Sequence, residues 1–192
     1  MNDIDMHAIK SELESGEQLL WSGRPRQGVV FRTNDVFIIP FSLLWLGMAI
    51  FIFNQAGEFE GGFIFSHMIF LIIGLYFVLG RFIVDRFIRR KTYYGITNER
   101  VIIISEFLRK ITKSIDLSTL SNINLTEFQY KRGTIYLGAY TLFDTMYEGM
   151  PSPGTGNGVP KLEMIDEAKS VYYILKNAKN ALTVEPDLSV KY

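Results

Sequence analysis

Few residues in this chain have side chains suited to acid–base, nucleophilic or metal chemistry. There is no cysteine, and the two histidines are His7, in a polar N-terminal stretch, and His67, inside a long apolar block. A nucleophile needs a base within hydrogen-bond reach, and a metal needs clustered ligands. Because the acidic residues are scattered and neither histidine has a histidine or cysteine neighbour, the sequence predicts no catalytic residue, no metal site and no cofactor. It favours a protein that is not an enzyme.

The glycine-rich stretch PGTGNG at 153–158 superficially resembles a phosphate-binding loop. It lacks the Lys-Ser/Thr that follows such a loop, and it does not open a helix directly after a strand. The composition of residues 151–160 instead predicts a flexible loop.

His67 is the one ionisable residue between residues 61 and 80. An ionisable group in hydrocarbon is costly, so such residues often serve as proton relays or ligand contacts. The position of His67 near the start of the block also suits a neutral, hydrated imidazole. Both interpretations stay open, and His67 is the possible intramembrane functional residue.

Four basic residues stand close together just after the second apolar block: Arg86, Arg89, Arg90 and Lys91. Each basic charge beside an anionic leaflet contributes roughly 1 kcal/mol of attraction. The cluster is therefore predicted to contact lipid headgroups, either at a specific lipid site or nonspecifically as a determinant of topology.

Two apolar blocks predict membrane-spanning helices. Residues 36–53 contain no charge, and eighteen residues at about 1.5 Å rise nearly match the ~30 Å hydrocarbon core. The second span is expected at 62–79, and Asn54 to Glu60 form a link that suits a helical hairpin. The hairpin domain is placed at 35–84.

The distribution of charge predicts the orientation. Net charge is zero, with 20 basic and 20 acidic residues, which argues against a nucleic-acid partner. The link between the spans carries Glu58 and Glu60 and no basic residue. The basic residues flank the outer ends of the pair: Arg24, Arg26, Arg32, Arg81, Arg86, Arg89, Arg90 and Lys91. By the positive-inside rule, both termini of this multi-pass protein face the cytoplasm.

The remainder of the chain predicts a β-rich domain with a C-terminal helix. Short β-branched and aromatic runs separated by turn residues predict an antiparallel meander. The candidate strands are Thr92–Thr97, Arg100–Ser105, Lys110–Leu117, Ile123–Phe128 and Thr134–Leu137. Apolar residues at helical spacing predict a helix over Ile165–Leu182. Upstream, Met6–Leu13 is a candidate helix, and residues 16–28 are expected to be a connector.

Three motifs resemble the bacterial pleckstrin-homology (PH) domain family: YYGITNERVIII at 93–104, SIDLSTLSNINL at 114–125 and GTIYL at 133–137. GEQLLWSGRP at 16–25 and the two adjacent spans are similar to its membrane-anchored members. The resemblance implies a bent antiparallel sheet or partly open barrel capped by a C-terminal α-helix. The expected fold is thus an α+β membrane protein with a cytoplasmic N-terminal segment (1–34), a hairpin and a cytoplasmic PH-like domain (85–192).

The function expected from these features is a non-enzymatic interaction module anchored in the inner membrane. Its domain would bind a protein partner, a second copy of the chain or anionic lipid headgroups, and tethering would make weak contacts effective. The alternative is an auxiliary subunit of a membrane transport or channel assembly. Two helices enclose no pathway alone, so this alternative requires oligomerisation.

Overall fold

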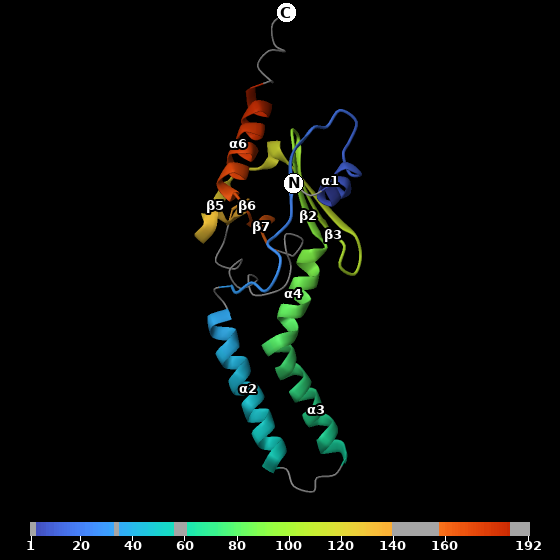
Figure 1. Ribbon diagram of the computed structural model, residues 1–192, viewed down its shortest axis with the longest axis vertical. Coiled ribbons are helices and arrows are strands. Elements are labelled where there is room, and N and C mark those ends of the chain that lie inside the picture. Colours follow the sequence, from blue (N-terminus) through green and yellow to red (C-terminus); the bar gives the residue numbers. More distant parts are fainter. Residues whose placement is uncertain (1–2, 33–34, 56–60, 140–157, 185–192) are drawn as a thin grey trace, which may run out of the picture.

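The computed structural model describes residues 3–32, 35–55, 61–139 and 158–184, and Figure 1 shows their arrangement. Two long helical segments lie side by side at one end of the molecule. Two antiparallel sheets and two further helices form the other end, which we call the body. Most of the glycine-rich loop at 151–160 and the link at 56–60 lie outside the described residues.

The helical pair agrees with the two predicted apolar blocks, although the second helix is longer than predicted. Helix α2 covers Asp35–Gln55. Helix α3 (Gly61–Leu75) continues through the π-helical segment η1 (Tyr76–Gly80) into α4 (Arg81–Arg90). Residues 61–91 contain no proline, and arginine is a good helix former, so nothing ends the helix at residue 79.

Two helical stretches, Asp35–Gln55 and Met68–Arg90, are long and apolar enough to cross a membrane. Only 11% of the most apolar window of α2 is buried, and 17% of that in the second stretch. The core helix of a soluble protein would be mostly buried. These helices instead expose large apolar side chains along their length.

The first sheet has the order β1-β2-β3-β4. Its strands are β1 (Leu19–Gly23), β2 (Thr92–Thr97), β3 (Arg100–Ser105) and β4 (Ile111–Asp116). The predictions for β2, β3 and β4 are confirmed. The predicted connector at 16–28 is wrong at β1, because Leu19–Gly23 pairs with β2 and Trp21 packs on the core. Helix α1 (Asp3–Lys10) covers this sheet with Ile9, which is fully buried beside Gly95.

The second sheet has the order β5-β6-β7 and is covered by helix α6 (Ala168–Val184). Its strands are β5 (Ile123–Glu127), β6 (Gly133–Leu137) and β7 (Lys161–Ile165), and short 3-10 turns lie at Leu117–Thr119 and Gln129–Lys131. Strand β7 was not predicted. The α+β class and a C-terminal helix packed on a sheet are confirmed.

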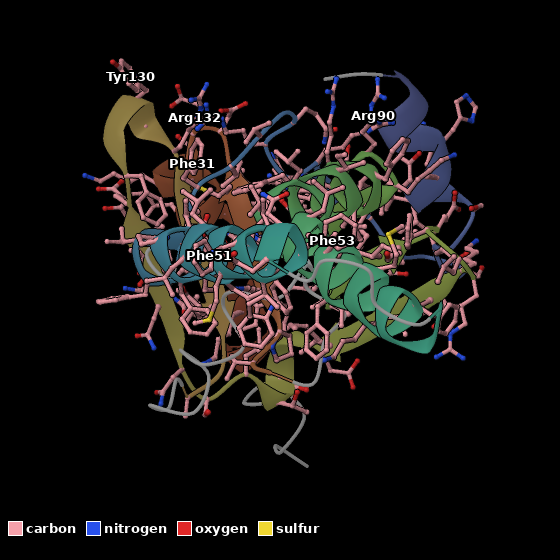
Figure 2. All side chains as sticks on the ribbon, turned by 90° about the horizontal axis from the view of Figure 1, so that it is seen from below. Phe31, Phe51, Phe53, Arg90, Tyr130 and Arg132 are labelled. Atoms are coloured by element: carbon pink, nitrogen blue, oxygen red, sulfur yellow. The ribbon has the colours of Figure 1, made fainter. Side chains whose placement is uncertain are left out.

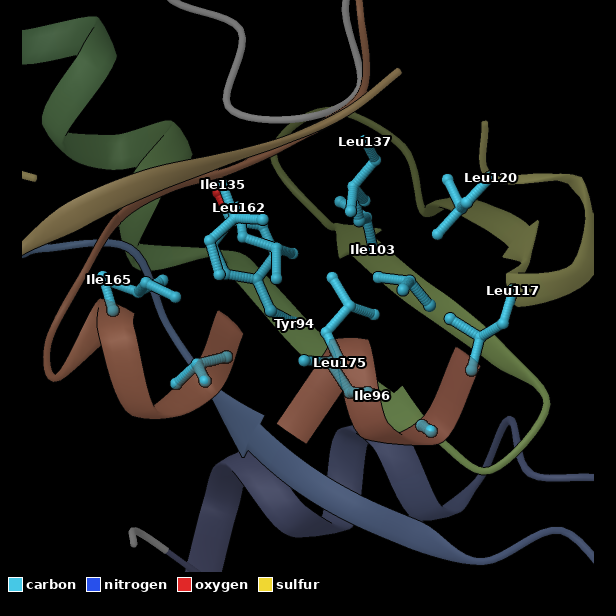
Figure 3. Close-up of a cluster of buried hydrophobic side chains, with 14 residues drawn as sticks. Tyr94, Ile96, Ile103, Leu117, Leu120, Ile135, Leu137, Leu162, Ile165 and Leu175 are labelled. Carbon is cyan, nitrogen blue, oxygen red and sulfur yellow. The ribbon is translucent and has the colours of Figure 1, made fainter. Parts of the chain in front are cut away.

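The core of the body lies between the two sheets and α6, as Figure 3 shows. The first sheet contributes Tyr94 and Ile103, the second contributes Ile135 and Leu162, and α6 contributes Leu175. Alternation along β6 turns Thr134 and Tyr136 to the face opposite this core. The second sheet therefore has an apolar face against α6 and a polar outer face.

Candidate functional site

Four charged side chains meet where the segment before α2, helix α4 and strand β7 come together. Arg32 contacts Asp85 at 2.8 Å and Glu163 at 3.0 Å. Arg89 contacts the other oxygen of Asp85 at 2.8 Å and donates to the Gly28 carbonyl at 3.2 Å. Because these residues come from three separate stretches, the network joins both long helices to the second sheet.

The four-charge network is almost completely removed from solvent. The exposed fractions are 0% for Arg89, 3% for Asp85 and 5% for Glu163, and the Arg32 side chain is 12% exposed. Buried charges are tolerated only when paired, and here two cations face two anions. Within the described residues, Nε and Nη1 of Arg89 have no hydrogen-bond partner. The Asp85 carboxylate is therefore the main group that compensates the buried charge of Arg89.

The electrostatics of the network favour the ionised forms of Glu163 and Arg32, whereas burial lowers the pKa of Arg89. Burial alone raises the pKa of the Glu163 carboxyl, but the positive charges of Arg32, Lys161 and Arg89 together outweigh burial, and the pKa lies below the ordinary value. Burial lowers the pKa of Arg32, and the carboxylates of Glu163 and Asp85 more than reverse this. Burial also raises the pKa of the Tyr94 hydroxyl, which accepts a hydrogen bond from the Glu163 backbone N–H at 3.3 Å. The Glu163 carboxyl therefore stays charged at neutral pH.

A second buried ion pair lies beside the network, at the first turn of α2. Arg81, the first residue of α4, contacts Asp35 at 2.8 Å. The second oxygen of Asp35 accepts the backbone N–H of Arg32 at 2.7 Å. This pair links the start of α2 to the start of α4 and connects directly to the network through Arg32.

The predicted basic cluster is divided by the structure. Arg86, Arg90 and Lys91 are exposed, whereas Arg89 is buried in the network. The reason is helical period: residues 81, 85 and 89 share one face of α4, and residues 86 and 90 share another. The prediction that Arg89 contacts headgroups is therefore wrong. The spacing of Asp85 and Arg89, four residues apart, was the signal for an ion pair instead.

The exposed face of α4 combines basic and apolar side chains. Ile83 and Phe87 are about half exposed and stand one turn apart beside Arg86 and Arg90. Figure 2 views the molecule from the end of the helical pair, and it shows Arg90 toward the green helix and Phe31, Tyr130 and Arg132 toward α2. Basic and aromatic groups therefore lie near both long helices in this view.

The histidines lie apart from this junction. His7 is exposed on α1. His67 belongs to α3, and its side chain is outside the described part of the structure. Among the described residues, no group of three or more His, Cys, Asp or Glu side chains is arranged to hold a metal ion.

The chain matches no protein-family model, no curated protein and no solved structure with which it was compared. Its function therefore has to be argued from the site itself.

Proposed function

We propose that this chain is a membrane-anchored, non-enzymatic interaction module whose body binds anionic lipid headgroups at the cytoplasmic surface of the inner membrane. Helix α2 and the long helix that begins with α3 would cross the bilayer as a hairpin, with α4 at its cytoplasmic end. The largely exposed apolar side chains of both helices support this anchor, since lipid would cover them. The excess of basic residues at the body end supports a cytoplasmic body.

The observation that carries the proposal is the buried four-charge network. Arg32 leads into α2, Asp85 and Arg89 belong to α4, and Glu163 belongs to β7. A body held by this network cannot swing as it would on a flexible tether. Its orientation to the bilayer is fixed, so one surface is presented permanently to the headgroups, and the contacts need not overcome the entropy of orienting the domain.

The exposed face of α4 is suited to the headgroup layer. Its ten residues rise about 15 Å from Arg81, which is paired with the first residue of α2. The headgroup region extends several ångströms beyond the hydrocarbon, so Ile83, Arg86 and Phe87 would stand within it. Apolar and basic side chains together are typical of surfaces that lie in this layer.

The PH-like fold remains part of the proposal. Two antiparallel sheets packed on one core with a C-terminal helix across it support this assignment, as do the sequence motifs. Strand β4 is an edge of the first sheet. A protein partner or a second copy of the chain would be able to add a strand there.

Neutralising α4 tests headgroup binding. In membranes with equal phosphatidylglycerol and phosphatidylcholine, R86Q/R90Q should weaken the preference of the full chain for phosphatidylglycerol by about 2 kcal/mol, roughly 30-fold, because each charge contributes about 1 kcal/mol. The measurement is the ratio of the two lipids retained by the purified protein, determined by native mass spectrometry. K169Q/K176Q removes two exposed charges from α6 and should leave the ratio unchanged. Equal ratios for both double variants would refute headgroup binding by α4.

The alternative, an auxiliary subunit of a membrane transport or channel assembly, is favoured by one feature. An apolar pocket of about 370 Å³ lies between α2 and α3, lined by Ile38, Phe41, Ser42, Trp45, Ile73, Gly74 and Phe77. The π-helical segment next to it is a kind of distortion frequent at functional sites. Solute flux in proteoliposomes containing only this protein would support the alternative over the anchor.

A further inference from the structure

A small pocket with both apolar and charged lining residues lies between the outer face of the second sheet and the segment leading into α2. Its volume is about 130 Å³. The sheet contributes Thr134, Tyr136, Lys161, Glu163 and Met164, and the other walls are Phe31, Arg32 and Phe128. None of these residues belongs to the exposed face of α4, so this is a separate site.

The pocket lies next to the point where α2 begins. Arg32 stands three residues before Asp35, the first residue of α2, and hydrogen bonds to it. Phe31 packs edge-on against Phe82 of α4, with ring centroids 5.5 Å apart. In Figure 1 the second sheet lies between α6 and the start of α2, with its outer face away from α6. This inference rests on the proposed function. With the two helices across the bilayer, the pocket lies at the level of the headgroups.

The charges around the pocket leave one cation in excess. Arg32 and Arg89 balance Asp85 and Glu163 within the buried network. Lys161 adds a third cation near Glu163, where it helps to lower the pKa of that carboxyl, and its ammonium stands 5.9 Å from the centre of the Tyr136 ring. The pocket therefore has a net charge of +1, which favours an anionic ligand.

We propose that this pocket binds the phosphate group of one anionic glycerophospholipid from the cytoplasmic leaflet. Lys161 supplies the positive charge, and basic pockets at this level of a membrane protein commonly hold anionic headgroups. The Thr134 hydroxyl, which accepts the Met164 N–H at 3.2 Å, can donate to a phosphate oxygen. The exposed ring of Phe31 lies where the glycerol and acyl chains would pass toward the bilayer.

The test uses the full chain in nanodiscs of phosphatidylcholine containing a small fraction of phosphatidylglycerol. The wild type should retain one phosphatidylglycerol through purification, counted by native mass spectrometry. K161A should lower this occupancy about fivefold, while K161R, which keeps the charge, and K176A, which removes an exposed charge from α6, should behave as the wild type. Equal retention by K161A and wild type, or equal losses in K161A and K176A, would overturn the proposal.

A competition arm separates a lipid from a soluble phosphate ester. Millimolar glycerol phosphate should not displace the retained phosphatidylglycerol, because the soluble ester lacks the contacts beyond the phosphate. If glycerol phosphate displaces phosphatidylglycerol from the wild type, and K161A abolishes this displacement, the pocket binds a soluble ligand and the lipid assignment is overturned. Loss of the lipid in K161A but not in R86Q/R90Q would refute headgroup binding by α4 while leaving the pocket intact. Loss of the lipid in R86Q/R90Q but not in K161A would refute lipid binding by the pocket and leave headgroup binding by α4 intact.

Discussion

Replacing Asp85 with alanine is expected to lower the free energy of unfolding of the body by about 3–5 kcal/mol, the usual cost of breaking a buried ion pair from one side. The change removes a carboxylate that contacts both Arg32 and Arg89 at 2.8 Å. Arg89 is fully buried, so its charge would keep the desolvation penalty without compensation. Denaturation of the full chain in detergent micelles, followed by Trp21 fluorescence in a W45F background, measures the loss.

Two variants make the Asp85 result interpretable. Asp166 pairs with Arg132 at 2.9 Å, but its side chain is 76% exposed, so D166A should cost no more than about 1 kcal/mol. The double variant D85L/R89M replaces one ion pair by apolar side chains and should recover a large part of the stability lost in D85A. A loss in D85A no greater than that in D166A would contradict the role assigned to the network.

Placing an arginine at Leu44 is expected to impair membrane insertion of α2 by about 2.5–3.5 kcal/mol, roughly a hundredfold in the insertion equilibrium. Leu44 lies near the middle of Asp35–Gln55 and is 66% exposed. In water an exposed Leu→Arg change costs almost nothing, whereas at the bilayer centre the charge must be desolvated. A protease site fused after Gln55 reports insertion, because it is protected in inside-out vesicles only when α2 has crossed.

Phe37→Arg is the matched control for Leu44→Arg. Phe37 is also largely exposed but lies in the first turn of α2, where a long basic side chain reaches the headgroups. F37R should therefore insert nearly as the wild type does. If L44R and F37R are protected equally, α2 does not lie across a bilayer, and the proposed anchor is refuted.

The elements predicted from the sequence are those whose signal is local. An eighteen-residue run without charge predicts α2, and β-branched alternation predicts β2 and β3, regardless of what packs against them. Strand β1 has the sequence LLWSG and is followed by Pro25, so it was interpreted as a connector. It is a strand because it pairs with β2, whose paired residues, from Gly23↔Tyr94 to Leu19↔Thr97, lie 71 to 78 positions further along the sequence. Such pairing leaves no local pattern.

Strand β7 was missed because its alternation is broken. Met164 has a φ of 49°, and the pairing of β6 with β7 shifts register between Gly133 and Ile135. As a result, Leu162 and Ile165 both face the core although they are three residues apart. Glu163 is buried on the opposite face, where Arg32 contacts it. A single sequence offers no reason to expect a buried glutamate there, since its partner, Arg32, is 131 residues away.

The four-charge network was not predicted from the sequence, for the same reason. Helical spacing was a local signal for the Asp85–Arg89 pair, but Arg89 was instead grouped with Arg86 and Arg90. The contacts of Arg32 and Glu163 depend on the tertiary fold. The fold brings the segment before α2 and strand β7 to the same face of α4. The pocket at Lys161 depends on the same packing.

The central claim, a two-helix anchor with a cytoplasmic body, is tested most directly by cysteine accessibility, since the chain has no cysteine of its own. One variant places a cysteine at Ala56, between the two spans, and another at Asn177, an exposed position on α6. A membrane-impermeant maleimide applied to intact cells should label A56C, and it should label N177C only after the membrane is opened. Labelling of N177C in intact cells, or of A56C only after opening, would contradict the claim.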